Sequence, residues 1–392
     1  MEEKRAFILR AFDRNENFSQ LCKEFGITPK TGYKWKERFL TDGMPGLEER
    51  SRKPKRHANQ LSEEVVCKII KIKALKPNWG APKIWKVYER ENTGSYLPSE
   101  SSVERVLRKA GLTEKKKRKR KRVGERLENR VEALRPNHVW TVDFKGWWYT
   151  VTGQKCEPLT VRDQYSRYIL SIRILEKGDI YHVKRHFEEL FKRYGLPEII
   201  RSDNGVPFAS AHGMYGLSSL AVWWLSLGIS LDRIAPGKPA QNGAHERMHA
   251  DIYRELEGKI QGDLKMHQAV FDTWRDEFNT ERPHEALQMQ TPAEFYIPSK
   301  RRYTRDIQLA YPAEVLRRIV NTRGVIHFKA HRVFISNAFN GYAVGLQYLD
   351  TARLAVHFGT WCIGYIDRSN YLFTPNEEVI QPKRRSILLP MF

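Results

Sequence analysis

The segment HVWTVDFKGWWYTV (residues 138–151) indicates the fold class, because it is rich in β-branched and aromatic residues that alternate with polar ones. This pattern predicts a strand that continues into a hairpin. The next apolar segment, LTVRDQYSRYILSIRIL (159–175), predicts a pair of strands or one long bent strand. Asp143 lies inside the first strand between Val142 and Phe144, where a carboxylate is costly unless it is paired or bound to a metal.

Further along the chain, helical and strand patterns alternate. Helical periodicity marks residues 181–195, 218–228, 244–260 and 264–282, and short strands are expected within 196–205 and at 229–234. Strands that come first and then alternate with helices predict a mixed α/β sheet. We therefore expect one α/β domain over residues 136–298.

Two more acidic residues stand at places where such a sheet opens a site. Asp203 follows the strand EIIRS, at the carboxyl end where ligand sites of α/β sheets lie. Glu246 is in the first turn of a helix, after the loop PGKPAQNG (236–243). Alone, a strand Asp is more often a hydrogen-bonded edge residue, and Asp-Asn-Gly is more often only a turn. Together with Asp143, the three positions predict a single acidic site.

Residues 1–50 predict a helix-turn-helix domain. A short helix ends at Phe25, and a second helix begins with Thr28 as N-cap and Pro29 at its first position. The second helix would bury Tyr33 or Trp35 and present a basic outer face. A plain helical hairpin is the alternative. The side chains expected to contact DNA are Lys30, Thr31, Lys34 and Arg38.

A second helical unit of three helices, also of helix-turn-helix type, is expected over residues 61–112. Its third helix starts at Pro98-Ser99 and would point Arg105 toward DNA. The basic linker that follows, residues 113–135, has too few apolar residues to build a core and contains KKKRKRKR at 115–122. Its expected DNA contacts are Lys116, Arg118 and Arg120.

The C-terminal segment, residues 310–380, contains short apolar alternations separated by turn residues, such as VIHFK, RVFIS and WCIGYID. This spacing predicts a small antiparallel β-barrel. The sequence alone leaves open whether such a module contacts DNA or serves as a scaffold or dimerisation domain.

The charge distribution points to a polyanionic partner. Lys and Arg number 68 against 46 Asp and Glu, which gives +22; residues 1–135 carry +16, residues 136–300 carry −1 and residues 301–392 carry +7. Basic groups that bind nucleic acid release counterions, so double-stranded DNA is the leading candidate rather than mere solubility.

Other classes of protein are not favoured. No stretch approaches about 18 consecutive apolar residues, so no membrane helix is expected. The N-terminus does not resemble a secretory signal, and the four cysteines form no CxxC pair. A reducing, cytoplasmic location fits these features best.

Three motifs resemble a known family. WTVDFKG (140–146), RSDNGVPF (201–208) and QNGAHERMHADI (241–252) look like the acidic motifs of DDE transposases with an integrase core. The resemblance is to the bacterial insertion-sequence type, with retroviral integrases more distant. It extends through NTERPHEALQMQTPAEFY (279–296) and covers about residues 136–298. The helix-turn-helix start and the expected barrel match the insertion-sequence layout.

The resemblance implies an RNase H-like fold in which Asp143, Asp203 and Glu246 are the catalytic carboxylates and the metal ligands. Two Mg²⁺ ions, replaceable by Mn²⁺, would be bound, with Asp143 bridging both. Without metal, the carboxylates would repel one another and at least one pKa would rise. The implied reaction is cleavage by water at the end of the element, followed by attack of the 3′-hydroxyl end on target DNA.

Two features depart from the family pattern. Between Asp203 and Glu246 lie 42 residues, more than is common in the wider family. The extra length falls in ASAHGMYG (209–216), which we expect to be a loop tolerated at low cost. The paired His and paired Cys of a retroviral zinc domain are absent, so no structural zinc is expected.

Residues near the acidic positions are weaker candidates. Asn204 could orient a metal-bound water or only support its turn, and His249 could contact substrate or lie on an exposed polar helix face. Trp147 and Trp148 could stack on a base, although core packing is favoured. The expected DNA contacts around Glu246 are Lys238, Gln241 and Arg247.

Three functions are compatible with these observations. The first is an active transposase, which would act as a homo-oligomer because two DNA ends are joined in one event. The second is an element-derived DNA-binding regulator whose catalytic core is inactive. The third, a tyrosine recombinase, would need no metal, and the Asp–Asp–Glu arrangement gives it no support.

Overall fold

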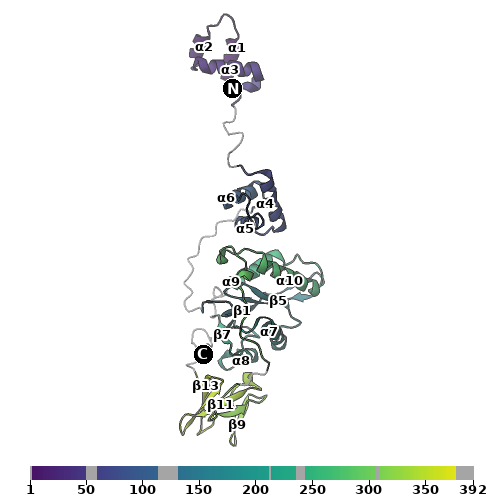
Figure 1. Ribbon diagram of the computed structural model, residues 1–392, viewed down its shortest axis with the longest axis vertical. Helices are drawn as coiled ribbons and strands as arrows, with labels where there is room; N and C mark the ends of the chain where they lie inside the picture. Colours follow the sequence, from purple (N-terminus) through teal and green to yellow (C-terminus); the bar gives the residue numbers. More distant parts are fainter. Residues whose placement is uncertain are drawn as a thin grey trace. The chain divides into compact units, whose positions relative to one another are not determined.

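The computed structural model describes residues 2–49, 60–113, 131–211, 213–234, 243–305 and 309–376 (Figure 1). The chain divides into two compact units, residues 1–65 and residues 66–392. In the described part of the chain, no helix combines the length and the apolar character needed to cross a membrane.

The first unit is a small helical bundle. It contains α1 (Glu2–Ala11), α2 (Phe18–Glu24), α3 (Pro29–Asp42) and the 3-10 turn η1 (Met44–Leu47). The Thr28 side chain accepts a hydrogen bond from the Thr31 backbone N–H, which caps α3 as the sequence predicts. The expected helix, turn and second helix are confirmed.

The helices of this unit approach one another closely at Gly32 of α3. A Cβ atom at this position would lie 2.8 Å from both Cys22 Sγ and Phe7 Cζ, so only glycine fits here without displacing the core. Of the two aromatic residues expected to be buried, Trp35 packs against the core, whereas Tyr33 is 60% exposed.

The second unit begins with three helices, α4 (Glu63–Leu75), α5 (Ala81–Glu91) and α6 (Glu100–Lys109), as expected for residues 61–112. Ser99 caps α6. Ion pairs join this helical unit to the α/β domain: Lys76 Nζ lies 2.9 Å from carboxylate oxygens of both Glu277 and Glu281. Arg90 pairs with Glu294 at 2.9 Å.

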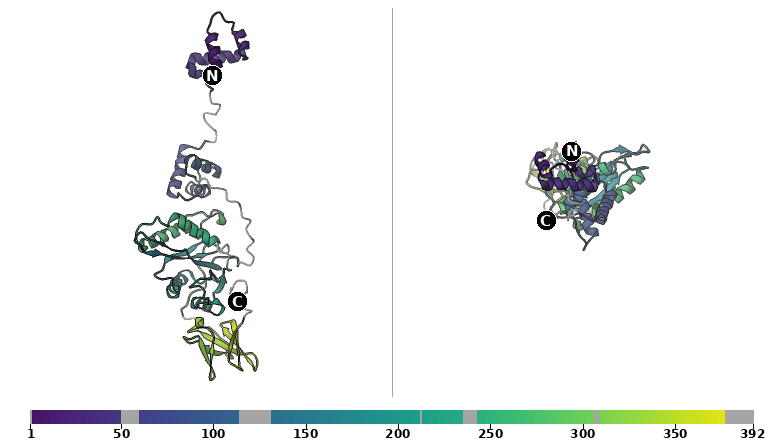
Figure 2. Two further views of the ribbon diagram at one scale, coloured as in Figure 1. Left: turned by 180° about the vertical axis from the view of Figure 1, so that it is seen from behind. Right: turned by 90° about the horizontal axis from the view of Figure 1, so that it is seen from above.

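The α/β domain contains a five-stranded mixed sheet in the order β5-β4-β1-β6-β7. Figure 2 shows this sheet with helices on both sides. β1 pairs antiparallel with β4 and parallel with β6. The expected mixed sheet is therefore confirmed. Its strands are β1 (Val139–Phe144), β4 (Pro158–Asp163), β5 (Ile169–Ile174), β6 (Ile199–Ser202) and β7 (Ser230–Arg233), with a β2 (Trp148–Tyr149) and β3 (Lys155–Cys156) hairpin beside it.

Helices cover both faces of this sheet. One face packs on α7 (Ile180–Tyr194) and α8 (Ser219–Ser226) through the larger apolar cluster. The other packs on α9 (Gly243–Glu255) and α10 (Leu264–Thr280) through a second cluster. A short helix, α11 (Pro292–Phe295), follows α10. This arrangement places α9, which carries Glu246, over the sheet.

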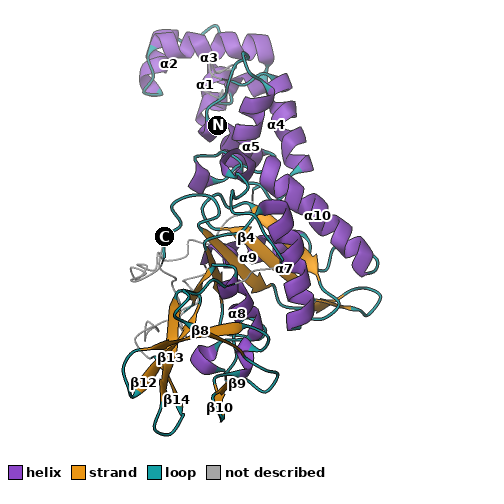
Figure 3. Cartoon of the chain, turned by 60° about the horizontal axis from the view of Figure 1, so that its bottom comes forward, coloured by secondary structure: helices purple, strands orange, loops and turns teal. Residues whose placement is uncertain are grey.

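The C-terminal strands correct one expectation. They form an antiparallel sheet in the order β14-β13-β12-β11-β8 and a separate hairpin of β9 and β10, so the sheets in the described residues are open and no closed barrel is observed (Figure 3). Local alternation predicts strands but not whether the end strands pair. The strands are β8 (Leu316–Ile319), β9 (Val325–Phe328), β10 (His331–Phe334), β11 (Ala343–Tyr348), β12 (Arg353–Phe358), β13 (Trp361–Asp367) and β14 (Phe373–Pro375).

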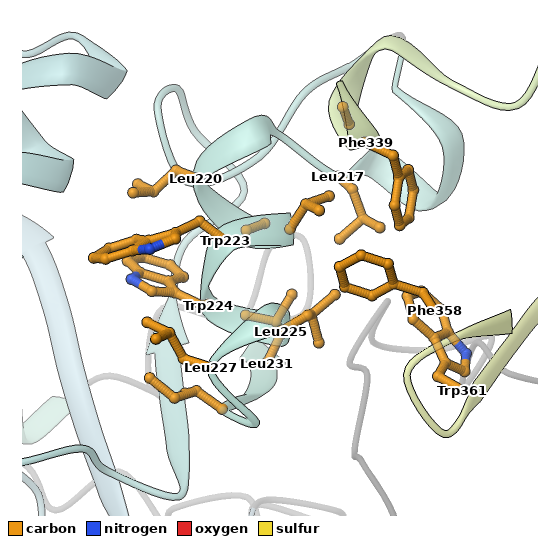
Figure 4. Packing of buried hydrophobic residues seen from close by; sticks show 14 of the residues in the cluster. Leu217, Leu220, Trp223, Trp224, Leu225, Leu227, Leu231, Phe339, Phe358 and Trp361 are labelled. Atoms are coloured by element: carbon orange, nitrogen blue, oxygen red, sulfur yellow. The ribbon is translucent and has the colours of Figure 1, made fainter. Parts of the chain in front are cut away.

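The C-terminal sheets share one apolar core with the α/β domain. Phe339, Phe358 and Trp361 lie beside Leu217 and Leu225, which flank or belong to α8 (Figure 4). All five side chains are at most 5% exposed. Because buried apolar area stabilises in proportion to its size, this contact attaches the C-terminal domain firmly to α8.

The segment 209–216, which we expected to be a loop tolerated at low cost, has defined structure and tertiary contacts. It contains a 3-10 turn at Met214–Gly216. The Tyr215 side chain is 9% exposed, and its hydroxyl contacts the carbonyl oxygens of Ile363 and Asn376. The extra residues therefore anchor the C-terminal sheet.

Candidate active site

A polar layer lies between α9 and the sheet. Side chains alternate along β1 and β4, so the apolar ones face α7 and α8 whereas Thr141, Asp143, Thr160 and Arg162 occupy the alternate positions. Hydrogen bonds from α9 to Thr141 and Thr160 show that this second set faces α9. Asp143 thus stands on the sheet face that α9 covers.

Two histidines of α9 hold the helix against this layer. His245 is buried and contacts the Thr141 hydroxyl through Nδ1 at 2.8 Å and the Thr160 hydroxyl through Nε2 at 2.7 Å. His249 Nε2 lies 2.8 Å from the same Thr160 oxygen. His249 therefore contacts the sheet through Thr160. The sequence suggested either contact with substrate or a place on an exposed polar helix face, and neither expectation included this contact.

The hydrogen bonds assign the histidine tautomers. The Thr160 hydroxyl donates its single proton to the Asp143 backbone oxygen, so both histidines donate to Thr160 through Nε2–H. Burial lowers the pKa of His249 to about 3 and that of His245 well below its usual value. Both rings are neutral at pH 7, and their hydrogen bonds connect α9 to β1 and β4.

Asp143 has an unusual acidity. Burial, followed by the negative charge of Asp203 and, to a smaller extent, that of Glu246, raises the pKa of the Asp143 carboxyl to about 7. A backbone hydrogen bond from Phe144 opposes the shift. Burial is the larger cause of the shift, and the charges of Asp203 and Glu246 add to it, so the three acidic residues influence one another electrostatically.

Asp203 lies directly after β6 and is exposed. Its Oδ1 accepts a hydrogen bond from the Gly205 backbone N–H at 3.1 Å. The Asn204 side-chain amide donates to the Ile234 carbonyl oxygen at 2.7 Å, just after β7. The sequence suggested that Asn204 either orients a metal-bound water or supports its turn, and the hydrogen bond to Ile234 fits a structural role.

Glu246 and Arg247 are exposed in the first turn of α9. Within the described ranges, no three His, Cys, Asp or Glu side chains lie close enough to hold a metal ion together. The carboxylates of 143, 203 and 246 consequently interact through space without forming a compact ligand cluster.

The predicted DNA contacts are distributed over several elements. On α3, Lys30 and Lys34 are exposed, and Thr31 and Arg38 are half-buried. Arg105 is exposed on α6 and donates to the Ser102 hydroxyl at 3.1 Å. Five of the predicted contacts lie outside the described residues, namely Lys116, Arg118, Arg120, Lys238 and Gln241.

The two neighbouring tryptophans have different positions. Trp148 is 9% exposed and packs against Phe271 of α10, whereas Trp147 is 56% exposed beside Tyr149. The favoured core packing thus holds for Trp148 only. Sequence reasoning missed Thr160 and Arg162, although the alternation in LTVRD places both on one face of a strand.

Known domain families match most of the chain. The family described as "Integrase core domain" matches residues 133–239 and, through a second family of the same description, residues 227–292. At the N-terminal end, a "Helix-turn-helix domain" matches residues 4–55 and a "Homeodomain-like domain" matches residues 31–107.

Proteins of bacterial insertion elements are similar in sequence. The 31.7 kDa protein of insertion element IS407 from Burkholderia multivorans is 28% identical over 253 residues, which cover 64% of this chain and 86% of that protein. The 39.2 kDa protein of IS476 from Xanthomonas euvesicatoria is 29% identical over 193 residues, covering 49% and 53% respectively.

Two solved structures are also similar. One is the HTLV-2 integrase catalytic core domain in complex with magnesium, with a TM-score of 0.34 and 18% identity over 42% of this chain and all of that one. The other is the simian T-cell lymphotropic virus intasome in complex with a PP2A regulatory subunit. Its TM-score is 0.36 at 13% identity, over 74% of this chain and 96% of that one.

The helix-turn-helix DNA-binding domains, the mixed sheet and the matched integrase core define a protein of the transposase and integrase class. Within that class, the chain carries an integrase core domain and is similar to proteins of the bacterial insertion elements IS407 and IS476.

Proposed function

We propose that this protein is the enzyme that moves its insertion element, cleaving DNA at the element's ends and transferring the 3′-hydroxyl ends into target DNA. One observation carries the proposal. Burial, together with the charges of Asp203 and Glu246 from two other parts of the fold, raises the pKa of Asp143. A DNA-binding regulator would have no use for such a costly group of carboxylates beside helix-turn-helix domains.

The three carboxylates suit divalent metal ions by their chemistry. Mg²⁺ prefers oxygen ligands, and a cation would relieve the repulsion that shifts the Asp143 pKa. Asp203 and Glu246 are exposed, so their side chains can turn toward Asp143 when a cation is present. When bound, a pair of ions would activate water and neutralise the leaving oxygen of the phosphodiester.

The rest of the site fixes the positions of these groups. β1 holds Asp143, and the turn of Gly205 orients the Asp203 carboxylate. The Thr160 and His245 contacts keep the first turn of α9 against the strands, which sets the distance from Glu246 to Asp143. We further propose that the enzyme works as a homo-oligomer, because one event joins two DNA ends.

The test uses the purified full-length chain and a labelled duplex that carries the inverted repeats flanking its gene. With Mg²⁺ or Mn²⁺, we expect nicking that leaves a 3′-hydroxyl, and EDTA abolishes it. Asp203→Asn should bind the same duplex with unchanged affinity but lose cleavage by about 10³-fold or more, since it removes a metal ligand. Asp276→Asn, an exposed position on α10 with an Arg275 partner, is the matched control and should cleave normally.

Other outcomes decide between the alternatives. Tight binding to the ends without any nicking by the wild-type chain would support the element-derived regulator. A covalent protein–DNA adduct that forms in EDTA would support a tyrosine recombinase. Full strand transfer by Asp203→Asn would refute the assignment of the acidic residues.

A further inference from the structure

A basic cavity of about 490 Å³ lies next to the acidic site, between α5, α9 and the segment after α10. Its lining includes Gly243 and Arg247 at the start of α9. Lys83 of α5, Arg282 and His284 also line it. The cavity therefore joins the second helical unit to the domain that carries Glu246.

Positive charge dominates its walls. Its lining contains six cationic side chains but only two carboxylates, those of Asp251 and Glu285. The excess is concentrated on the inner wall, because Arg162 and Arg282 are only 2% and 3% exposed. The six cationic residues are Lys83, Arg162, Arg167, Arg247, Arg254 and Arg282.

Two lining side chains retain unused hydrogen-bonding capacity. Arg282 pairs with Glu255 and Asp251 at 3.1 Å through its terminal nitrogen, yet its buried Nε–H contacts no acceptor among the described residues. The buried His284 Nε2 also has no partner among the described residues. Buried donors normally have partners, so the Arg282 Nε–H indicates a missing acceptor.

Burial and the neighbouring cations make the charged form of Lys83 less stable, which lowers the pKa of its amine. Burial, followed by the charge of Arg282, lowers the pKa of the Lys83 amine to about 8. A cation kept at such a cost inside a protein commonly serves a ligand rather than stability. An anion bound among these residues would stabilise the charged form of Lys83 and the buried arginines.

We infer that this cavity binds a phosphate group of the DNA strand that passes the acidic site, so that Lys83 couples the second helical unit to the bound strand. The inference rests on the proposed function and names a contact within it. A phosphodiester fits better than an isolated small anion because Arg247, which lines the cavity, is adjacent in sequence to Glu246. The N-terminal end of α9 adds a favourable partial charge at the same edge.

The first experiment measures phosphate binding alone, in EDTA, so it does not depend on cleavage. The full-length chain is melted in increasing inorganic phosphate, with chloride of equal ionic strength as reference. We expect a saturable rise in Tm for the wild type. Lys83→Met should require about tenfold more phosphate, because it removes one charge-assisted contact, while its Tm without phosphate stays equal or rises.

Lys86→Met is the matched control. Lys86 lies on the same helix, pairs with Glu89 and does not line the cavity, so its phosphate response should equal that of the wild type. Arg247→Gln provides a second variant on the opposite wall and should weaken the response as Lys83→Met does. A phosphate response that is equal in all four proteins, or absent from the wild type, overturns the inference.

The second arm separates a DNA phosphodiester from a free phosphate. DNA affinity is measured in EDTA over a range of salt for the wild type and Lys83→Met. Loss of one phosphate contact should reduce the slope of log affinity against log salt by about one. If Lys83→Met loses phosphate binding but keeps the full slope, the cavity holds free phosphate and the DNA assignment is wrong. Failure of nicking with both arms intact would refute the proposed enzyme but not this contact.

Discussion

At the residue scale, Asp143 is a buried carboxyl whose negative charge is costly to the folded protein. Its carboxyl lies on the sheet face that α9 covers. Burial, followed by the charges of Asp203 and Glu246, raises its pKa to about 7. Between pH 4 and 7 the folded protein therefore holds a proton that the unfolded chain releases. The resulting stability is fully present below the unfolded pKa and is lost as pH rises through about 7.

This sign leads to a prediction for Asp143→Asn. Asn is neutral at every pH, so in EDTA the variant should melt several degrees above the wild type at pH 8 and about half as far above it at pH 5.5, midway through the window in which the wild type loses stability. Added Mg²⁺ should raise the Tm of the wild type at pH 8 but not that of the variant. Differential scanning calorimetry at the two pH values measures both effects. A variant that melts below the wild type at pH 8 would show that ionised Asp143 does not burden the metal-free fold.

Among the elements, the 3-10 turn at Met214–Gly216 has the clearest architectural role. The Tyr215 hydroxyl contacts carbonyl oxygens on both sides of the β13–β14 connection, and its ring lies 5.6 Å from that of Trp361. Removing the hydroxyl deletes a buried hydrogen bond, which costs about 0.5–1.5 kcal/mol, while the Ile363 carbonyl oxygen keeps its hydrogen bond from the Asn376 backbone N–H.

Tyr215→Phe should therefore loosen the C-terminal sheet selectively. We expect amide hydrogens of residues 361–376 to exchange about tenfold faster, since 1.4 kcal/mol corresponds to a factor of ten, while residues 2–49 stay unchanged. Hydrogen exchange with mass spectrometry gives the readout. Tyr348→Phe, whose ring is 46% exposed on β11, is the control and should have no effect. Equal exchange in Tyr215→Phe and the wild type would mean that apolar packing alone attaches the sheet.

The elements also show what the sequence could predict. Helix starts such as Thr28 and Ser99 were predictable because a cap and its helix are neighbours in the chain. The link from Thr160 to His245, the role of Tyr215 and the open C-terminal sheet were not, because each depends on partners brought together only by folding. The acidic residues could be proposed from the sequence because each lies in its own local motif, whereas no local motif marks the basic cavity.

At the scale of the whole molecule, the net charge differs strongly between the domains. The α/β segment that carries the acidic site has a net charge of −1, whereas the segments before and after it carry +16 and +7 and so hold the entire excess. Basic flanking domains can bind the DNA backbone while the acidic site keeps the charge needed for cations. The cavity around Lys83 and Arg282 is the exception, a basic site built against the α/β domain itself.

The division into two compact units gives a last prediction, for a chain that starts at residue 61. Because α4 begins at Glu63, this truncation removes α1–α3 and keeps every element of the second unit. Calorimetry should show the transition of residues 66–392 within about 2 °C of its full-length position, since no element of that unit is lost. The preference for element ends over scrambled duplex should fall at least about tenfold, because α3, the helix that we expect to read the bases, is gone. Undiminished preference in competition binding would assign end recognition to α4–α6 instead.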